Sequence, residues 1–409
     1  MSPASHTGDL DAVTAPDLRE RGSLKWTGID QDRNQDQDQD TIGAWVAEMD
    51  FGTAPEVTAA LHAAVQDGRF GYLPPGRRAD LALTCAQWQQ RRYGWAVAPE
   101  QVQPVSDVLT ALELTIRHFT RPGSPVILPT PAYMPFLTTP PLHGRAVLEV
   151  PMATDGGQYV LDLDGLDRAY RAGGQLLILC NPANPVGRVL TAGELAAVTA
   201  VVDRHGGRVF ADEIHAPLVY PGHRHVPYAS TSGTAAGHTL TATAASKAWD
   251  LPGLKCGQVI TSNQADAAAW EVVGSSASVA ASQLGAVAAT AAYRSGERWL
   301  DGILGYLDRS RLALGELLAA HLPELGYRPP EGTYLAWLDC RALAALDGTA
   351  PGGGDPAEFF RRHAGVAVVD GAECGQAGRG YVRLNFATPL PILRQAVTRM
   401  AEAAAGQRR

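Results

Sequence analysis

The chain alternates short apolar runs with longer segments in which apolar residues recur at helical spacing. The apolar runs predict strands at residues 102–106, 124–129, 147–151, 176–180 and 208–211. The longer segments predict helices at residues 79–93, 107–117, 163–172 and 191–205. Thr191 with Glu194 three residues later is typical of a capping box at a helix start. Strands that alternate with helices in this way indicate an α/β fold with a mostly parallel sheet and helices on both faces.

The two ends of the chain follow different patterns. Residues 1–24 are expected to form a poorly ordered arm, and the Gln- and Asp-rich stretch 31–40 an exposed loop, with a short strand at 45–47. Beyond residue 270, small residues over 274–290 predict a closely packed helix, and 299–322 predicts a long helix that links two parts of the molecule. The remaining expected elements are strands at 333–338, 366–369 and 381–386, helices at 356–363 and 392–405, and a loop at 351–354.

Composition and charge narrow the class of protein. A length of 409 residues suggests two packed parts, and 45% hydrophobic residues suit a soluble globular protein. No apolar run approaches the ~20 residues that a membrane span needs, and no signal peptide is visible. The five cysteines are scattered without a CxxC pair, which favours the reducing cytoplasm over a disulfide framework or a zinc site. A net charge of -8 argues against nucleic acid as the main partner.

Polar residues follow two neighbouring apolar segments of the predicted sheet, and a lysine follows the run of small and hydroxylic residues at 241–246. Asn184 lies in the turn after 176–180, Asp212 ends the strand that follows, and Ser246-Lys247 precedes a Pro-Gly turn. Carboxyl ends of strands in an open α/β sheet are where ligands bind. Pyridoxal phosphate (PLP) requires such a set, because it takes a lysine as a Schiff base, an acid against its pyridine nitrogen, and donors for its ring oxygen and phosphate.

Two longer motifs connect the chain to a known family. The chain resembles the class I/II (fold type I) PLP-dependent aminotransferase family at Asp212, at Ser246-Lys247 and in two motifs. These motifs are Trp45-Val46-Ala47-Glu48-Met49-Asp50-Phe51 and Arg383-Leu384-Asn385-Phe386-Ala387-Thr388-Pro389. The resemblance is narrower to its cystathionine β-lyase (C–S lyase) branch, and it covers nearly the whole chain beyond the first twenty-odd residues. It implies an N-terminal arm and part of a small domain over 1–50, a large PLP-binding domain over 51–295, and a small α/β C-terminal domain over 296–409.

The resemblance implies roles for individual residues. Lys247 would be the catalytic lysine that bonds the cofactor, and Asp212 the acid against the ring nitrogen. Arg383 would bind the substrate carboxylate, with Ala47 beside the substrate. The remaining cofactor-binding residues would be Tyr133 stacked on the ring, Asn184 and His215 at its oxygen, and Val108, Leu109, Ser246 and Lys255 at the phosphate end. Tyr72 would reach the phosphate of a neighbouring subunit, which implies a homodimer with shared active sites.

The implied reaction is β-elimination of a cystathionine-like cysteine S-conjugate to a thiol, pyruvate and ammonia. Transamination, decarboxylation or oxidative deamination of an S-cysteinyl intermediate, and a non-enzymatic PLP-fold regulator are the alternatives. The chain departs from the family pattern at several positions that border the cofactor or substrate: Glu48, Asp107, Trp249-Asp250, Val369-Asp370-Gly371 and Cys374. These departures leave the natural substrate, and the outcome after activation of Cα, open. The Asp107 side chain is expected to turn away from the phosphate, because a carboxylate there would repel it.

Overall fold

A seven-stranded sheet forms the centre of the larger part of the molecule. The structure is a computed structural model that describes residues 10–28, 40–344 and 355–406. In spatial order the strands are β2 (Val102–Val105), β10 (Gly257–Thr261), β9 (Thr239–Thr243), β8 (Arg208–Asp212), β7 (Leu176–Cys180), β3 (Val126–Thr130) and β4 (Val147–Pro151). β10 runs antiparallel to both of its neighbours, and the remaining pairs are parallel. The predicted α/β class is therefore confirmed.

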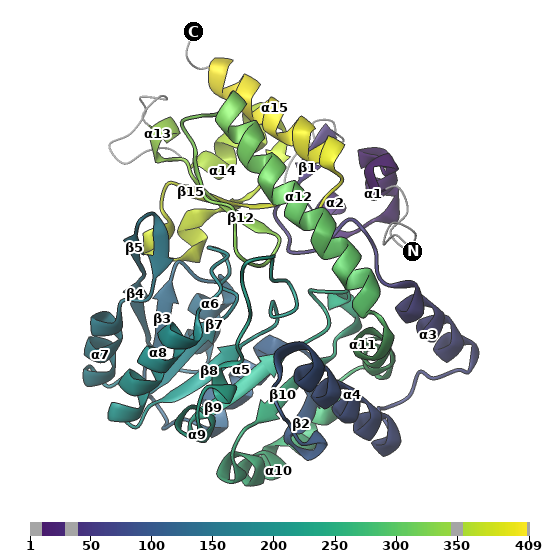
Figure 1. Ribbon diagram of the computed structural model, residues 1–409, viewed down its shortest axis with the longest axis vertical. Coiled ribbons are helices and arrows are strands. Elements are labelled where there is room, and N and C mark those ends of the chain that lie inside the picture. The colour runs from purple at the N-terminus through teal and green to yellow at the C-terminus, as the bar shows by residue number, and fades with distance from the viewer. Residues whose placement is uncertain (1–9, 29–39, 345–354, 407–409) are drawn as a thin grey trace.

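Helices cover both faces of this sheet (Figure 1). Successive side chains of a strand point to opposite faces of the sheet, so the side chains of β7 divide between two hydrophobic clusters. Leu176 and Ile178 pack into one core cluster, and Leu177 and Leu179 into another. The first cluster includes side chains of α5 (Val108–His118), α6 (Pro135–Leu142) and α10 (Gln264–Val279), and the second includes side chains of α7 (Leu163–Arg171), α8 (Ala192–Arg204) and α9 (Gly233–Gly237). Thr191 and Glu194 form the predicted capping box at the start of α8.

A four-stranded antiparallel sheet lies in the second part of the molecule. Its strands, in spatial order, are β11 (Gly326–Tyr327), β12 (Leu335–Asp339), β15 (Tyr381–Asn385) and β14 (Val369–Asp370). The long helix α12 (Glu297–His321) packs against α15 (Leu390–Gly406) at one end and extends to the larger part at the other (Figure 1). Short elements complete the two parts: the hairpin β5 (Ala153–Asp155) and β6 (Gln158–Val160), α13 (Arg341–Ala344) and α14 (Pro356–Phe359).

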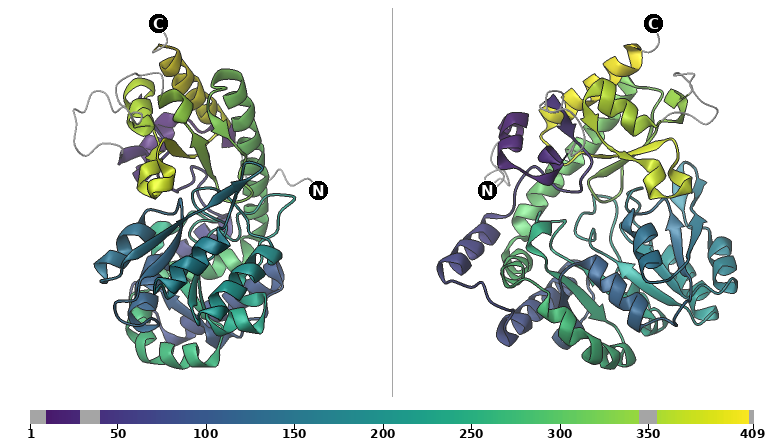
Figure 2. Two further views of the ribbon diagram at one scale, coloured as in Figure 1. Left: turned by 90° about the vertical axis from the view of Figure 1, so that its left-hand side faces the viewer. Right: turned by 180° about the vertical axis from the view of Figure 1, so that it is seen from behind.

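The N-terminal segment is better ordered than the sequence suggested. Residues 10–28 include α1 (Ala15–Arg21) and α2 (Leu24–Thr27), and β1 (Ile42–Gly43) pairs in parallel with β13 (Val366–Ala367). The segment lies beside the C-terminal elements (Figure 2). Lys25 is fully buried, and its Nζ lies 2.8 Å from Asp50 Oδ2. The expectation of a poorly ordered arm is therefore wrong for residues 10–24, and the strand expected at 45–47 lies instead at Ile42–Gly43.

Three further helices pack together at the side of the main sheet: α3 (Pro55–Gln66), α4 (Pro75–Tyr93) and α11 (Gln283–Ser295). The single helix expected over 274–290 is instead α10 and α11, and Ser282 caps the second of them by accepting a hydrogen bond from Gly285 N. The helix expected over 356–363 is an α-helix only as far as Phe359, and one π-helical turn follows it. The loops expected at 31–39 and 351–354 lie outside the described residues. Within the described ranges, no helix combines the length and apolar character that a membrane span requires.

Candidate active site

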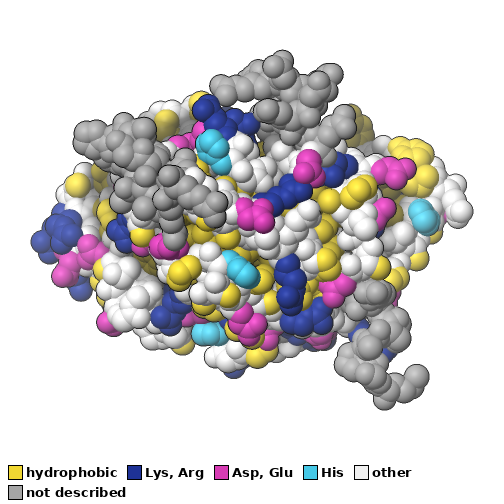
Figure 3. Space-filling model, turned by 90° about the horizontal axis from the view of Figure 1, so that it is seen from above, with side chains coloured by type: hydrophobic (Ala, Val, Ile, Leu, Met, Phe, Trp, Pro, Cys, Tyr) yellow, Lys and Arg dark blue, Asp and Glu magenta, His cyan; other side chains and the backbone are white. Residues whose placement is uncertain are grey.

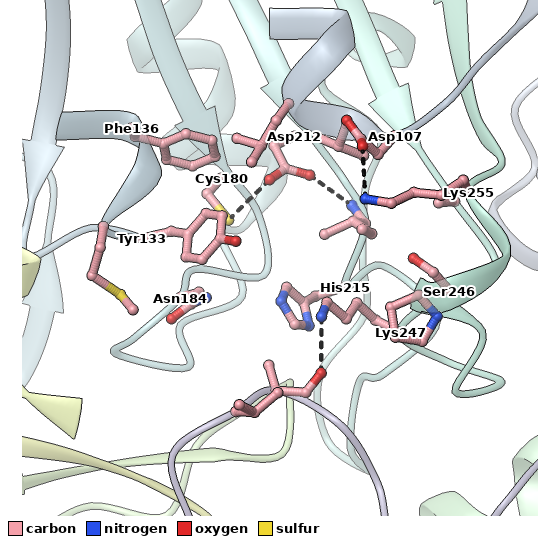
Figure 4. A pocket seen from close by; sticks show the side chains of 18 of the residues that line it. Asp107, Tyr133, Phe136, Cys180, Asn184, Asp212, His215, Ser246, Lys247 and Lys255 are labelled. Atoms are coloured by element: carbon pink, nitrogen blue, oxygen red, sulfur yellow. Dashed lines mark hydrogen bonds and ion pairs between the residues drawn. The ribbon is translucent and has the colours of Figure 1, made fainter. Parts of the chain in front are cut away.

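A pocket with a volume of about 310 Å³ opens at the carboxyl ends of the parallel strands (Figure 4). Asp212 comes from the end of β8, Lys247 from the loop after β9, and Arg383 from β15 of the second sheet. The site residues that the sequence predicted and that line this pocket are Ala47, Val108, Leu109, Tyr133, Asn184, Asp212, His215, Ser246, Lys247, Lys255 and Arg383. Elements from distant parts of the chain thus place the predicted site residues in one pocket.

Tyr72 is the one predicted site residue that does not line this pocket. Its side chain is 84% exposed, in a separate surface depression formed by residues 69–72 and 279–284. The role implied for Tyr72 in a neighbouring subunit stays a prediction, and an exposed tyrosine is available for such a contact.

Lys247 presents a half-buried amine to the pocket. Its Nζ donates to the carbonyl oxygen of Ala47 at 2.8 Å. Burial lowers the pKa of Lys247 to about 8, against the opposing effect of Asp250, which raises it. A lysine with a pKa near 8 is neutral in a substantial fraction of molecules at physiological pH, and the neutral amine is the form that attacks a carbonyl or accepts a proton.

Asp250 connects the lysine loop to the segment that carries Ala47. Its Oδ1 accepts a hydrogen bond from Met49 N at 3.0 Å, and the residue has a φ of 54°. Few non-glycine residues other than Asn and Asp adopt this left-handed conformation readily. The departure Trp249-Asp250 therefore fits the local backbone, and it fixes the position of the Ala47 carbonyl relative to Lys247.

Asp212 is a buried carboxylate at the floor of the pocket (Figure 4). It is 4% exposed, its Oδ1 accepts a hydrogen bond from Ile214 N at 3.0 Å, and the Cys180 thiol lies 3.9 Å from Oδ2. Burial raises its pKa to about 7, and Lys247 acts in the opposite direction. No ion pair to Asp212 forms within the part of the chain that the structure describes. Such a carboxylate is suited to bind a cationic N–H group of a ligand, because a buried charge needs a partner.

His215 and Asn184 provide polar groups beside Lys247. His215 is 2% exposed, its Nδ1 is buried without a hydrogen-bond partner among the described residues, and burial lowers its pKa to about 3. The ring is therefore neutral at physiological pH and holds one N–H donor. Asn184 Oδ1 accepts a hydrogen bond from Arg383 Nη1 at 3.1 Å, which orients the amide. An unpartnered donor and an oriented amide suit an oxygen atom on a ligand.

The opposite end of the pocket is an anion site that already holds a carboxylate. Val108 and Leu109 begin α5, where backbone N–H groups and the helix dipole favour a negative charge. Asp107 Oδ1 accepts a hydrogen bond from Thr110 N at 2.8 Å, and Oδ2 lies 3.2 Å from Lys255 Nζ. Burial alone would raise the pKa of Asp107, but the bonds from Thr110 and Lys255 lower it below its usual value. The Asp107 side chain thus caps the helix and pairs with Lys255. That it turns away from a bound phosphate stays a prediction.

Arg383 lies at the middle of β15 and is 3% exposed. Its Nη2 donates to the carbonyl oxygen of Trp45 at 2.9 Å, Nη1 donates to Asn184, and Nε has no partner among the described residues. These contacts hold the planar guanidinium in one orientation at the pocket wall. An unpaired buried guanidinium can bind a carboxylate through two parallel hydrogen bonds.

The pocket also contains residues that the sequence did not single out for this role. Trp45, Met134 and Cys180 line it, and the Trp45 contact uses the backbone, which no side-chain pattern predicts. Val369, one of the departures expected to border the cofactor or substrate, lines the pocket as well. The set as a whole fits PLP: an amine for its aldehyde, a buried acid for its ring nitrogen, polar groups for its ring oxygen, and an anion site for its phosphate.

Comparisons with known proteins agree with this geometry. The family model described as "Aminotransferase class I and II" matches residues 43–400. Cystathionine beta-lyase of Corynebacterium glutamicum is 37% identical, covering 94% of this chain and 97% of its own, and cystathionine beta-lyase PatB of Bacillus subtilis is 32% identical, covering 89% and 92%. The crystal structure of the PLP-bound C–S lyase from Staphylococcus hominis superposes with a TM-score of 0.87 at 25% identity over 97% of this chain and 98% of the other. The chain therefore belongs to the aminotransferase class I and II family.

Proposed function

We propose that this protein is a PLP-dependent C–S β-lyase that converts a cysteine S-conjugate into a thiol, pyruvate and ammonia. The observation that carries the proposal is the Lys247 amine in one pocket with the Asp212 carboxylate and the Arg383 guanidinium. Relatives that match along most of both chains bear the names cystathionine beta-lyase and C–S lyase. This combination favours the lyase over the other reactions of the family.

The residues that would hold the cofactor follow from their chemistry. Lys247 would bond its aldehyde, Asp212 would keep its ring nitrogen protonated, and Tyr133 would cover one face of the ring. Asn184 and His215 would contact the ring oxygen, whereas Val108, Leu109, Ser246 and Lys255 would bind the phosphate. When bound, PLP supplies an electron sink for the bonding electrons released at the substrate Cα.

Two side chains, those of Arg383 and Lys247, would orient the substrate and transfer protons. Arg383 would bind the α-carboxylate of the substrate and so direct the Cα–H bond toward Lys247. The substrate amine would first replace Lys247 at the cofactor aldehyde, and the freed Lys247 Nζ would then accept the Cα proton. The pKa of about 8 of this free amine suits a base near neutral pH. The electron pair of the Cα–H bond becomes the Cα=Cβ bond, and the sulfur leaves with the pair of the Cβ–S bond. Lys247 then returns its proton to the sulfur, and water hydrolyses the released 2-aminoacrylate to pyruvate and ammonia.

Product analysis tests the proposal. Purified protein loaded with PLP and given S-substituted L-cysteines should release thiol, pyruvate and ammonia in equal amounts, and Lys247→Ala should release none. Carbon dioxide with an aldehyde that retains the sulfur would identify a decarboxylating enzyme. A stoichiometric keto acid with pyridoxamine phosphate would identify an aminotransferase, and binding of PLP without turnover of any conjugate would favour a regulator.

We propose that the active unit is a homodimer with shared active sites, to which Tyr72 contributes. The support is the exposure of several large apolar side chains around one depression: Phe70 at 67%, Tyr72 at 84% and Val279 at 55%. Clustered exposed apolar side chains are typical of an interaction surface.

We propose a cytoplasmic location and no nucleic-acid or membrane partner. The support is the net charge of -8, the free cysteines, and the interspersed acidic and basic side chains on the face drawn in Figure 3. A division into residues 1–50, 51–295 and 296–409 as arm, large PLP domain and small C-terminal domain likewise remains a proposal.

A further inference from the structure

The carbonyl oxygen of Ala47 is a fixed hydrogen-bond acceptor in the pocket wall. Asn385 Nδ2 donates to the two carbonyls that flank it in the chain, at 2.6 Å each, and the hydroxyl of the fully buried Tyr334 donates to the Ala47 oxygen itself at 2.9 Å. Lys247 Nζ donates to the same oxygen at 2.8 Å. Because other side chains hold this segment, the carbonyl stays in place when the Lys247 amine gains or loses a proton.

Asp250 binds the same short segment through its carboxylate. Met49 N, two residues beyond Ala47, donates a hydrogen bond to Asp250 Oδ1 at 3.0 Å. Asp250 and Lys247 lie three residues apart in the loop after β9, so both side chains reach residues 47–49 from one loop. Among the described residues, no lysine or arginine forms a direct ion pair with the half-buried Asp250. Its negative charge is therefore available to Lys247.

Charged groups from several elements act on the Lys247 amine. Burial has the largest effect and lowers its pKa, and Asp250 is the strongest of the charges that raise it. Arg383 acts in the same direction as burial, whereas Glu48 and Asp212 act with Asp250. Burial raises the pKa of Asp250 to about 7, so its carboxylate is mostly ionised at pH 8. The other titratable groups that face these two side chains are Lys25, Tyr334 and the neutral His215. Since the proposed function assigns Asp212 to the ring nitrogen of the cofactor, Asp250 is the main counter-charge left for a protonated Lys247.

We propose that the Ala47 carbonyl and the Asp250 carboxylate together hold the proton that Lys247 takes from the substrate, with Asp250 as a positioning residue. The proposal rests on the C–S lyase function proposed above and deepens it. The proton moves from Cα to Lys247 Nζ, the electron pair of the Cα–H bond stays with the substrate, and the proton passes to the sulfur when the Cβ–S bond breaks. Between these two transfers Lys247 is an ammonium ion inside the pocket, and such an ion needs a hydrogen-bond acceptor and a counter-charge.

Asp250→Asn separates the charge from the geometry. Asn adopts the left-handed conformation of this position, where φ is 54°, and its Oδ1 can still accept the hydrogen bond from Met49 N. Trace acetylation of the PLP-free protein between pH 6 and 10, with mass spectrometry of the peptide that contains Lys247, measures the pKa of this amine. The pKa should be about one unit lower in Asp250→Asn than in the wild type, and unchanged in the exposed control Asp155→Asn. The same pKa in all three proteins would overturn the inference.

The PLP-loaded enzyme provides a second readout. With L-cystathionine as substrate, Asp250→Asn should lower kcat about 3- to 10-fold, because a base weaker by about one pKa unit removes a proton more slowly. KM should change less than about twofold, since Asp250 acts through Lys247 and not on the substrate. Glu48→Gln should shift the pKa of Lys247 in the same direction but by less. A larger shift in Glu48→Gln than in Asp250→Asn, or an unchanged kcat in Asp250→Asn, would contradict the role of Asp250.

The acetylation experiment separates this inference from the proposed reaction, because it requires no turnover. If the wild type releases thiol from no conjugate but Asp250→Asn lowers the pKa of Lys247, Asp250 is the counter-charge of the lysine and the lyase function fails. If the wild type releases thiol and pyruvate but the pKa of Lys247 is the same in Asp250→Asn, the lyase function stands and the inference about Asp250 falls.

Discussion

Replacement of Asp212 by Asn should stabilise the protein when PLP is absent, although it removes a residue of the proposed active site. The wild-type carboxylate is 4% exposed and burial raises its pKa to about 7, so above that pH it carries a buried charge. Asn has nearly the same shape, and its Oδ1 can still accept the hydrogen bond that Ile214 N donates at 3.0 Å. The substitution therefore removes the charge and keeps the packing.

The expected magnitude follows from the pKa shift. A rise from 3.8 to about 7 corresponds to about 4 kcal/mol, at 1.36 kcal/mol per pKa unit. Because the folded-state pKa of Asp212 is raised, its protonated carboxyl makes a favourable contribution to the free energy of unfolding. This contribution is complete below the unfolded pKa of 3.8 and is lost as the pH rises through about 7. The stability gained by Asp212→Asn should thus be small near pH 4 and approach about 4 kcal/mol at pH 8.

Urea unfolding of the PLP-free proteins at several pH values between 5 and 8 measures this difference. The exposed Asp155→Asn provides the matched control for the same chemical change on the surface. PLP should stabilise the wild type more than Asp212→Asn, because only the carboxylate can pair with the protonated ring nitrogen. A difference between wild type and Asp212→Asn that does not grow with pH would refute the reasoning.

Other parts of the structure carry predictions of their own. Lys25→Met should lower the free energy of unfolding by about 3–5 kcal/mol, because it leaves the Asp50 carboxylate buried without its cation, and the additional change Asp50→Asn should restore part of the loss. A loss below about 1 kcal/mol in urea unfolding would show that this ion pair does not hold the N-terminal segment. Arg383→Lys should lower kcat/KM several-fold to about a hundred-fold, as about 1–3 kcal/mol implies, because lysine keeps the charge but loses the two parallel hydrogen bonds. A near-normal kcat/KM would exclude the proposed carboxylate contact. Mixed dimers of Tyr72→Phe and Lys247→Ala should regain activity that neither variant has alone, and no recovery after verified subunit exchange would count against shared sites.

The sequence predicted the main sheet well because local patterns determine it. The apolar run that forms β7 divides its side chains between two cores, and such a run needs burial on both faces. Asp212 and Lys247 follow neighbouring strands, so topology alone brings them to one edge of the sheet. The pocket that contains both residues was predictable for this reason.

Contacts between distant segments were not predictable in the same way. Lys25 looks like a surface residue in the sequence, and its burial depends on Asp50 and on the carbonyl oxygen of Ala387, which lies 362 residues away. The orientation of Arg383 depends on the backbone of Trp45. The break between α10 and α11 was missed because small residues fit a continuous helix as well as an interrupted one.

The assignment of Lys247 as the residue that bonds the cofactor is the central claim, and peptide mapping tests it most directly. The PLP-loaded protein would be reduced with borohydride, digested, and analysed by mass spectrometry. The expected result is one phosphopyridoxyl group per chain, attached to Lys247, with none after reduction of Lys247→Ala. Attachment at Lys255 or at another lysine, or no covalent attachment in a protein that has bound PLP, would contradict the account.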